Sequence, residues 1–273
     1  MSNPLDTVTI RDLTTLEEYT ECVDLQEETW GRGFSERVPG AILRVSQKIG
    51  GVTAGAFDCN GRMIGFVFGM TGIRDGRPAH WSDMLAVREE ARGRHIGDRL
   101  KHYQRERCIS LGVQTMLWTA DPLVARNAHF NINRLGARPV EYVENIYGAN
   151  TGSTLHGELP TDRFVYAWEL MEPYTPTPGS DAVRPGDGDL PLANPLAGDG
   201  LPAFAADASG RAVRVQVPHD LVAVQGAGGD DAMRWRLSVR AAFGAHFARG
   251  LKVVRFVRAQ GGAYPYYVLE ASA

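Results

Sequence analysis

The stretch that decides the fold is LAVREEARGRHIGDRL, residues 85–100. Its first three residues end a β-rich run, which predicts a strand over residues 81–87. A charged turn follows, and a glycine-containing loop then opens an amphipathic helix, with Ile96, Leu100, Tyr103 and Leu111 on one side. Because the first turn of a helix leaves its N–H groups without intrahelical partners, this junction predicts an anion site.

Two glycines and two arginines give this junction the chemistry to hold a pyrophosphate. Gly93 and Gly97 let the backbone approach phosphate oxygens closely, and Arg92 and Arg94 supply charge-assisted hydrogen bonds. Glycine and arginine before a helix also occur in plain turns, so the order of the surrounding elements has to decide between the two interpretations.

Upstream of this junction, the pattern predicts a strand, two helices and a hairpin. A strand starts at residues 8–10, and a helix runs through TTLEEYTECVDLQEETWG, where Thr14 and Glu17 have the spacing of a capping box. A shorter helix covers residues 41–48. The runs GVTAGAFDC and RMIGFVFGMTG meet at Asn60-Gly61, a dipeptide that favours a type I′ hairpin turn.

Downstream, the pattern predicts a strand in TMLWTA, a helix over residues 124–135 ended by Gly136, and strands around VEYVENIY and DRFVYAWEL. This order mixes antiparallel and crossover connections. We therefore expect residues 1–171 to form an α/β domain, of the α+β kind, around a sheet with both parallel and antiparallel strands (a mixed sheet). Residues 172–210 are rich in Pro and Gly and are interpreted as a linker. Residues 211–273 predict a small C-terminal α+β module.

Composition argues against several classes of function. The net charge is −3, with basic residues scattered along the chain, so we expect no nucleic-acid partner. The three cysteines lack CxxC spacing and the seven histidines lack HExxH spacing, so neither a disulfide framework nor a metal site is expected. The sequence contains no leader-like start and no uncharged run of about 18 residues, which favours a cytoplasmic protein without a membrane partner.

The motif at residues 85–100 resembles the signature of the GNAT acyltransferase superfamily. That signature, LxV…RGxGIGxxL, is matched by Leu85, Val87, Arg92, Gly93, Ile96, Gly97 and Leu100. A second signature resembles ARNAHFNINRLGA, and the likeness spans residues 8–170. The phrases FGMTGIRDG, LWTADPLVARNAHFNINRLGA and PTDRFVYAWEL are similar to a narrower GNAT group. Some members of that group are associated with N-succinylamino acid racemases.

The resemblance implies an acyl-CoA-dependent N-acyltransferase that passes an acetyl or succinyl group directly to an amino acid or similar small amine. Acetyl-CoA or another acyl-CoA is then the donor, and a homodimer is left open. The pantetheine arm is expected along the strand that ends at residue 87, with a main-chain N–H there facing the thioester oxygen. The cofactor-binding residues are expected to be Leu85, Ala86, Val87, Arg92, Gly93, Arg94, His95, Ile96, Gly97, Asp98 and Asn127.

The attacking amine must lose a proton, and the candidate catalytic carboxylates are Asp83 and Glu144, with Glu89 as a further candidate. Each is equally compatible with an ordinary solvated charge. The candidate substrate-binding residues are Trp30 and Arg163; Arg163 would bind a carboxylate, and Arg44 is the alternative.

Two positions depart from the superfamily pattern. His95 stands where glycine is usual, and Ile132 stands where many members carry the tyrosine that protonates the departing thiolate. Tyr142 or Tyr147 is a candidate replacement, although aromatic residues on strands more often serve packing. The alternative function is therefore a non-catalytic acyl-CoA-binding regulatory module.

Overall fold

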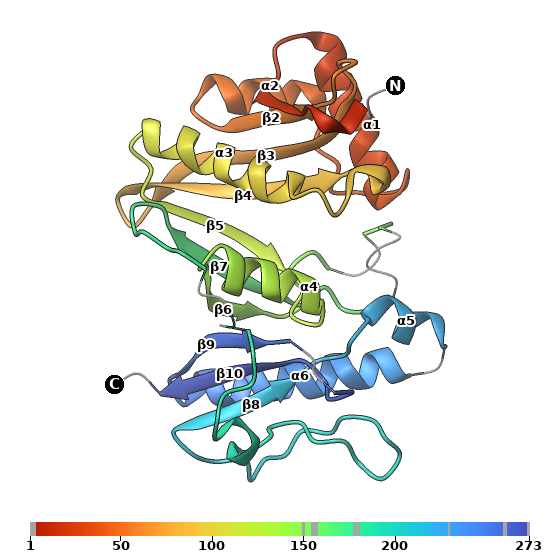
Figure 1. The fold of residues 1–273 in the computed structure, drawn as a ribbon, viewed down its shortest axis with the longest axis vertical. Helices are drawn as coiled ribbons and strands as arrows, with labels where there is room; N and C mark the ends of the chain where they lie inside the picture. Colours follow the sequence, from red (N-terminus) through yellow and green to blue (C-terminus); the bar gives the residue numbers. More distant parts are fainter. Residues whose placement is uncertain are drawn as a thin grey trace. The chain divides into compact units, whose positions relative to one another are not determined.

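The computed structural model describes residues 4–148, 151–153, 158–176, 179, 181–228, 230–258 and 261–271. The chain forms two compact units. The first comprises Met1–Trp118, Asn150–His156 and Glu169–Glu172, and the second comprises Thr119–Ala149, Gly157–Trp168 and Pro173–Ala273. Figure 1 shows the order of their elements along the chain.

The first unit is built on a mixed set of strands in the order β1-β2-β3-β4-β5, of which the last two residues of β5 belong to the second unit. Neighbouring strands from β1 to β4 are antiparallel, whereas β4 and β5 are parallel. The strands are β1 (Thr9–Asp12), β2 (Val52–Phe57), β3 (Met63–Arg74), β4 (Arg77–Val87) and β5 (Thr115–Ala120). The predicted α/β fold with a mixed sheet is confirmed.

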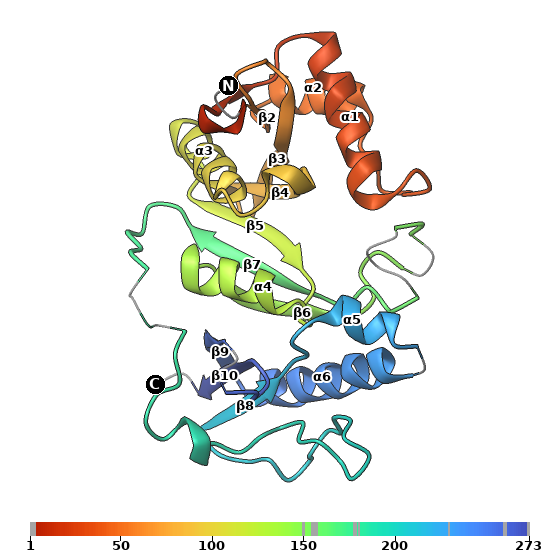
Figure 2. The same ribbon diagram turned by 45° about the vertical axis from the view of Figure 1, so that its right-hand side comes forward.

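Three helices cover this sheet: α1 (Leu16–Trp30), α2 (Gly40–Lys48) and α3 (Ile96–Ser110). Figure 2 shows α3 on one side of β2–β4 and α1 and α2 on the other. On the α1–α2 side, Phe66, Phe68, Met84 and Ala86 belong to the same buried apolar cluster as Leu25 of α1. The β4 residues that face away from this cluster are therefore free to pack against α3.

The first helix begins one residue later than the sequence suggested. Thr15, not Thr14, is the N-cap residue: its hydroxyl accepts a hydrogen bond from Glu18 N, and Glu18 completes the capping box. The prediction of Thr14 and Glu17 was therefore wrong by one residue. Adjacent threonines and adjacent glutamates offer the same spacing twice, and Arg11 selects Glu18 by an ion pair at 2.6 Å.

The hairpin at Asn60-Gly61 is present, but its turn is not type I′. That turn needs positive φ at both residues, and among the described non-glycine residues only Asp75, His95 and Asn145 have it. The Asp58 carboxylate instead accepts hydrogen bonds from Asn60 N at 2.9 Å and Arg62 N at 3.0 Å, which favours a longer turn. The two-residue turn with positive φ occurs at Asp75-Gly76, between β3 and β4.

The second unit contains two sets of strands. One pairs β6 (Arg138–Val143) antiparallel with β7 (Arg163–Glu169), whose last residue belongs to the first unit. The other is a three-stranded antiparallel sheet in the order β8-β10-β9. Its strands are β8 (Ala212–Gln216), β9 (Leu251–Val257) and β10 (Tyr266–Ala271).

The predicted small C-terminal α+β module is confirmed as a set of elements. Besides these three strands it contains α6 (Asp231–Ala248) and a helix that the sequence pattern missed, α5 (Leu221–Gly226). Asn194, from the Pro/Gly-rich segment, is buried and hydrogen-bonded to the main chain of Gln216 on β8. The domain boundaries at residues 171 and 210 stay a prediction.

The helix expected over residues 124–135 changes character along its length. It starts as α4 (Ala125–Ala128) and continues as a π-helix over His129–Arg134. Gly136 follows with φ 74°, and the Tyr174 ring lies where a Cβ at this position would stand. Glycine is therefore required there both by the backbone angle and by packing.

Candidate functional site

The loop before α3 presents an uncapped helix N-terminus. Gly93 and His95 both have positive φ, 78° and 58°, and His95 is the N-cap residue but makes no side-chain cap. The buried side chains of Ala91 and Ile96 hold the two ends of the loop to the core. Because no cap side chain takes up the first-turn N–H groups, they remain available to an anion.

The backbone of His95 is left-handed, which is why glycine would suit this position better. A left-handed conformation costs a residue with a Cβ about 1–2 kcal/mol, and glycine avoids this cost. The His95 side chain is exposed, so the imidazole occupies no space inside the loop. The backbone path is therefore kept at some cost in stability.

Both arginines of the loop are exposed, and each contacts one or two protein groups, Arg94 Nη1 also donating to Leu5 O at 3.5 Å. Arg92 Nε donates to Val87 O at 3.2 Å, and Arg94 Nη1 lies 3.7 Å from Asp6 Oδ1. These contacts leave further guanidinium N–H groups at the loop surface, where a phosphate would need them. Asp98 lies half-buried in the first turn of α3.

The end of β4 lies directly beneath this helix start. A Cβ at Gly97 would stand 3.4 Å from Leu85 Cδ2 and 3.9 Å from Val87 Cγ2, so Leu85 and Val87 face α3 while Ala86 faces the opposite core. Gly97 thus brings the first turn of α3 close to the strand. The described ladder between β4 and β5 stops at Trp81–Leu117, so it does not reach the β4 edge at residues 82–87.

A β-bulge interrupts β4 at Asp83. Met84 pairs with Phe68 and Ser82 pairs with Gly69, which leaves Asp83 as the extra residue. Its half-buried carboxylate accepts a hydrogen bond from Trp81 and is repelled electrostatically by the Glu36 carboxylate. Burial raises the pKa of Asp83 above its ordinary value, and Glu36 acts in the same direction. A carboxylate with a raised pKa is a suitable proton acceptor near neutral pH.

Trp30 lies at the end of α1 in the same unit. Its ring stacks on Phe34 with centroids 5.7 Å apart and meets Phe66 edge-on at 6.3 Å. It is only partly buried and packs against the core cluster of the α1–α2 side. Arg44, the alternative carboxylate partner, lines a pocket of about 360 Å³ beside Tyr19 and Val23.

Glu89 starts the short 3₁₀ turn Glu89–Ala91 of the first unit, and three further predicted residues, Asn127, Glu144 and Arg163, lie in the second unit. Asn127 is half-buried on α4, and Glu144 is an exposed carboxylate 3.2 Å from Arg240 Nη1. Arg163 is buried: its Nη1 donates to Asp162 O at 2.9 Å and lies 3.4 Å from Asp121 Oδ2. Protein groups thus already contact the guanidinium that was expected to bind a substrate carboxylate.

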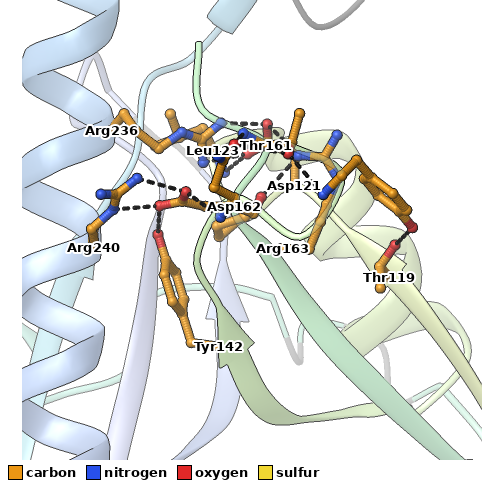
Figure 3. Close-up of polar contacts among 12 residues, drawn as sticks. Thr119, Asp121, Leu123, Tyr142, Thr161, Asp162, Arg163, Arg236 and Arg240 are labelled. Atoms are coloured by element: carbon orange, nitrogen blue, oxygen red, sulfur yellow. Dashed lines mark hydrogen bonds and ion pairs between the residues drawn. The ribbon is translucent and has the colours of Figure 1, made fainter. Parts of the chain in front are cut away.

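Arg163 is part of a larger buried cluster that sequence reasoning missed (Figure 3). Arg236, only 1% exposed, binds Asp121 through both terminal nitrogens at 3.0 and 2.5 Å. Arg240 binds Asp162 in the same two-pronged way at 2.8 Å for each bond. The partners are 115 and 78 positions apart, so no local motif could reveal them.

The two tyrosines considered as replacement acids also have protein partners. Tyr142 donates to Asp162 Oδ2 at 2.7 Å, and Tyr147 shares a hydrogen bond of 2.6 Å with Thr119. Burial and the neighbouring Asp162 raise the pKa of Tyr142 far above its ordinary value. Ile132 lies half-buried in the π-helix.

Within the described part of the chain, no group of three or more His, Cys, Asp or Glu side chains is arranged to hold a metal ion. None of the described helices is long and apolar enough to cross a membrane.

No protein-family model and no curated protein matches this chain. Similar solved structures include the ribosomal-protein-S18-alanine N-acetyltransferase from Escherichia coli, with 15% identity and a TM-score of 0.47 over 63% of this chain and 99% of that one. An N-acetyltransferase from Staphylococcus aureus Mu50 has 14% identity and a TM-score of 0.48 over 60% and 99%. Aminoglycoside 6'-acetyltransferase type Ii has 17% identity and a TM-score of 0.47 over 61% and 99%. These similarities are too low to assign an activity.

Proposed function

We propose that this chain is an acyl-CoA-dependent N-acyltransferase that transfers an acetyl or succinyl group to an amino acid or similar small amine. The observation that carries the proposal is the junction of β4 and α3. Here an uncapped helix start, flanked by Arg92 and Arg94, follows a strand whose described pairing with β5 has ended. The first feature suits a pyrophosphate and the second suits an extended chain that pairs with the strand edge.

The dimensions of the junction fit this donor. Five residue steps separate Val87 from Ser82, which is about 17 Å along a strand at roughly 3.3 Å per residue. That length is comparable to an extended pantetheine arm. Phosphates at Gly93–Gly97 would then place the thioester near Ser82 and Asp83, where the bulge turns backbone groups out of the regular ladder.

The properties of Asp83 support the proposal that the acyl group is transferred to an amine. Its raised pKa and its place at the bulge suit a base that takes the proton of the attacking amine, directly or through water. Main-chain N–H groups at the bulge, near Ser82 and Asp83, are candidates to stabilise the charge on the thioester oxygen. Those near Ala86 or Val87, which the sequence suggested for this role, would contact the pantetheine arm instead. Glu144 remains a candidate only as an exposed carboxylate paired with Arg240.

The decisive experiment measures thiol release from acetyl-CoA and succinyl-CoA with a panel of D- and L-amino acids, and confirms each amide by mass. Amide that depends on both substrates supports the proposal. Binding of acyl-CoA without any amide would favour the regulatory module instead.

The variant Gly97→Trp tests the donor site. A tryptophan in the first turn of α3, above Leu85, would cover the N–H groups that a phosphate needs, so we expect acyl-CoA affinity to fall by about tenfold or more, at least 1.4 kcal/mol. Gly72→Trp is the matched control, because Gly72 is exposed and a Cβ there meets nothing within 4 Å. Unchanged affinity in folded Gly97→Trp, measured by calorimetry, would contradict the assignment of this loop.

A further inference from the structure

Lys101 is a buried lysine whose described contacts are all to neutral groups. It is 4% exposed, and its Nζ donates to Ser82 Oγ at 2.6 Å and to Gln104 Oε1 at 3.4 Å. The same nitrogen lies 3.6 Å from Met116 Sδ and 4.1 Å from the centre of the Trp118 ring. Burial lowers the pKa of Lys101 to about 7. A buried ammonium without a charged partner destabilises the folded protein. A lysine that is kept at such a position is therefore a candidate for a role in the chemistry.

The position of Lys101 is specific. Trp81–Leu117 is the last described pair between β4 and β5, and Ser82 and Trp118 are the next residue on each strand. Lys101 Nζ contacts both. The amine therefore lies at the base of the opening between the two strands, where the proposed donor would place its thioester.

Neighbouring side chains of a strand point to opposite faces of the sheet, and the bulge sets which of them faces α3. Ser82 Oγ contacts Lys101 and Gln104, which belong to α3. Asp83 instead interacts with Trp81 and Glu36, on the face away from α3. One face thus carries a proton acceptor and the other a proton donor, at adjacent positions of one strand.

We propose that Lys101, acting through the Ser82 hydroxyl, supplies the proton to the thiolate that leaves during transfer. The inference rests on the proposed acyltransferase function. The amine nitrogen forms a bond to the thioester carbon, the C–S bond breaks, and its electron pair stays on sulfur. Sulfur takes the Ser82 proton, the Lys101 ammonium restores it, and Asp83 holds the proton lost by the amine. Return of that proton to Lys101 through water after product release completes the balance.

The Ser82 hydroxyl has the contacts that such a relay needs. It accepts a hydrogen bond from Lys101 and donates one to Gln104 Oε1 at 2.8 Å. Rotation about the C–O bond redirects the donated proton without moving the side chain. This group would take over the task of the tyrosine that Ile132 replaces.

Among the described residues, two other titratable groups interact electrostatically with Lys101: His80 on β4 and Cys108 on α3. Burial, aided by the Lys101 charge, lowers the pKa of His80 to about 3, and burial raises the pKa of Cys108 to about 12. From β5 the contacts are Met116 and Trp118, which do not titrate. Near neutral pH, the protonation change in this cluster therefore belongs to Lys101.

The test is the pH dependence of kcat at saturating acyl-CoA and amine, for the wild type, Lys101→Met and Ser82→Ala. The wild type should lose kcat as pH rises through about 7, because the ammonium is the active form. Lys101→Met should lower kcat by about a hundredfold and abolish this decline, with KM for acyl-CoA nearly unchanged. Ser82→Ala should lower kcat comparably. Arg107→Met, which removes an exposed cation from the same helix, is the control.

The outcomes separate the two proposals. No amide from the wild type would overturn the acyltransferase assignment, and this inference with it. Amide formation with an unchanged decline of kcat in Lys101→Met would overturn the lysine's role alone. A purely structural lysine would shift KM and the melting temperature but leave the decline in place. Should Lys101→Met not fold, loss of kcat in Ser82→Ala decides the matter, and retained kcat there overturns the relay.

Discussion

At the residue scale, Asp83 is the side chain on which the proposed chemistry depends most directly. We expect Asp83→Asn to lower kcat by about 10²–10⁴-fold, because the amide keeps the size and the hydrogen bond from Trp81 but does not take a proton. Acyl-CoA affinity should stay within about twofold, since the donor contacts lie further along β4. Amide formation and calorimetric binding measure the two effects separately.

Asp75→Asn is the matched control for this change. Asp75 carries the same side chain in the β3–β4 hairpin, is exposed, and has φ 52°, a conformation that asparagine also tolerates. Its replacement should leave kcat and affinity unchanged. An equal loss in both variants would mean that Asp83 acts through the stability of the hairpin and not as a base.

The sequence could identify Asp83 as a candidate but not its geometry. Its place two residues before Leu85 made it a candidate, whereas the bulge that directs it away from α3 depends on the register with Phe68 and Gly69 of another strand. Lys101 was missed for a related reason. A lysine on an amphipathic helix usually lies on the solvated face, and only the packing of α3 against β4 shows that this one is buried.

At the element scale, Asp187 holds the short helix Asp187–Asp189 of the Pro/Gly-rich segment against β9 and β10. It binds Arg255 through both oxygens, accepts from Tyr266 at 3.1 Å and caps Arg184 N at 2.8 Å. Asp187→Asn should lower the free energy of unfolding by roughly 3 kcal/mol at pH 7, because Arg255 would stay buried without its charge partner. Urea unfolding measures the loss.

The pH dependence of this loss has a defined sign. Burial disfavours the Asp187 carboxylate, but Arg255 and the other donors outweigh it and lower its pKa to about 2. The stabilisation is therefore complete above the unfolded pKa near 4 and fades as pH falls from 4 to 2. Asp189→Asn, at the exposed end of the same short helix, is the control and should change stability little. A loss that persists at pH 2 would contradict the ion-pair explanation.

Elements with strong periodicity were predicted well, and short or conditional ones were not. The pattern found α3, α6 and the strands on either side of them, because buried residues recur at helical or alternating spacing there. It missed α5, whose six residues are too few to show a period and which Asp220 caps through two N–H groups. It also could not foresee the π-helix over His129–Arg134.

At the scale of the whole molecule, a few buried groups determine the pH of greatest stability. Lys101, with its pKa lowered from 10.5 to about 7, and His80, lowered from 6.5 to about 3, bind protons more readily in the unfolded chain. The His80 contribution to the unfolding free energy should therefore rise from pH 3 to 6.5, and the Lys101 contribution from pH 7 to 10.5. Each rises by up to about 1.4 kcal/mol per pH unit. Cys22 and Cys108 act in the opposite direction.

Burial raises the pKa of both cysteines from 9 to about 12, so the unfolded chain loses these protons first and stability falls above pH 9. Two falling contributions then exceed the one that still rises. We expect the melting temperature to pass through a maximum near pH 9, above the range of pH 5–8 that is common for proteins. A maximum at or below pH 7 would contradict the lowered pKa of the buried Lys101.

Lys101→Met connects this stability argument with the proposed chemistry. An apolar side chain of similar length removes the cost of the buried ammonium, so the variant should be more stable at pH 7 by roughly 1–4 kcal/mol, and the rise between pH 7 and 9 should flatten. The same variant is expected to be slower in transfer. If Lys101→Met is more stable but has a lower kcat than the wild type, the lysine serves proton transfer and lowers the stability of the fold. Lower stability at pH 7 would instead mean that Ser82, Gln104 and the Trp118 ring hold the ammonium more strongly than burial disfavours it.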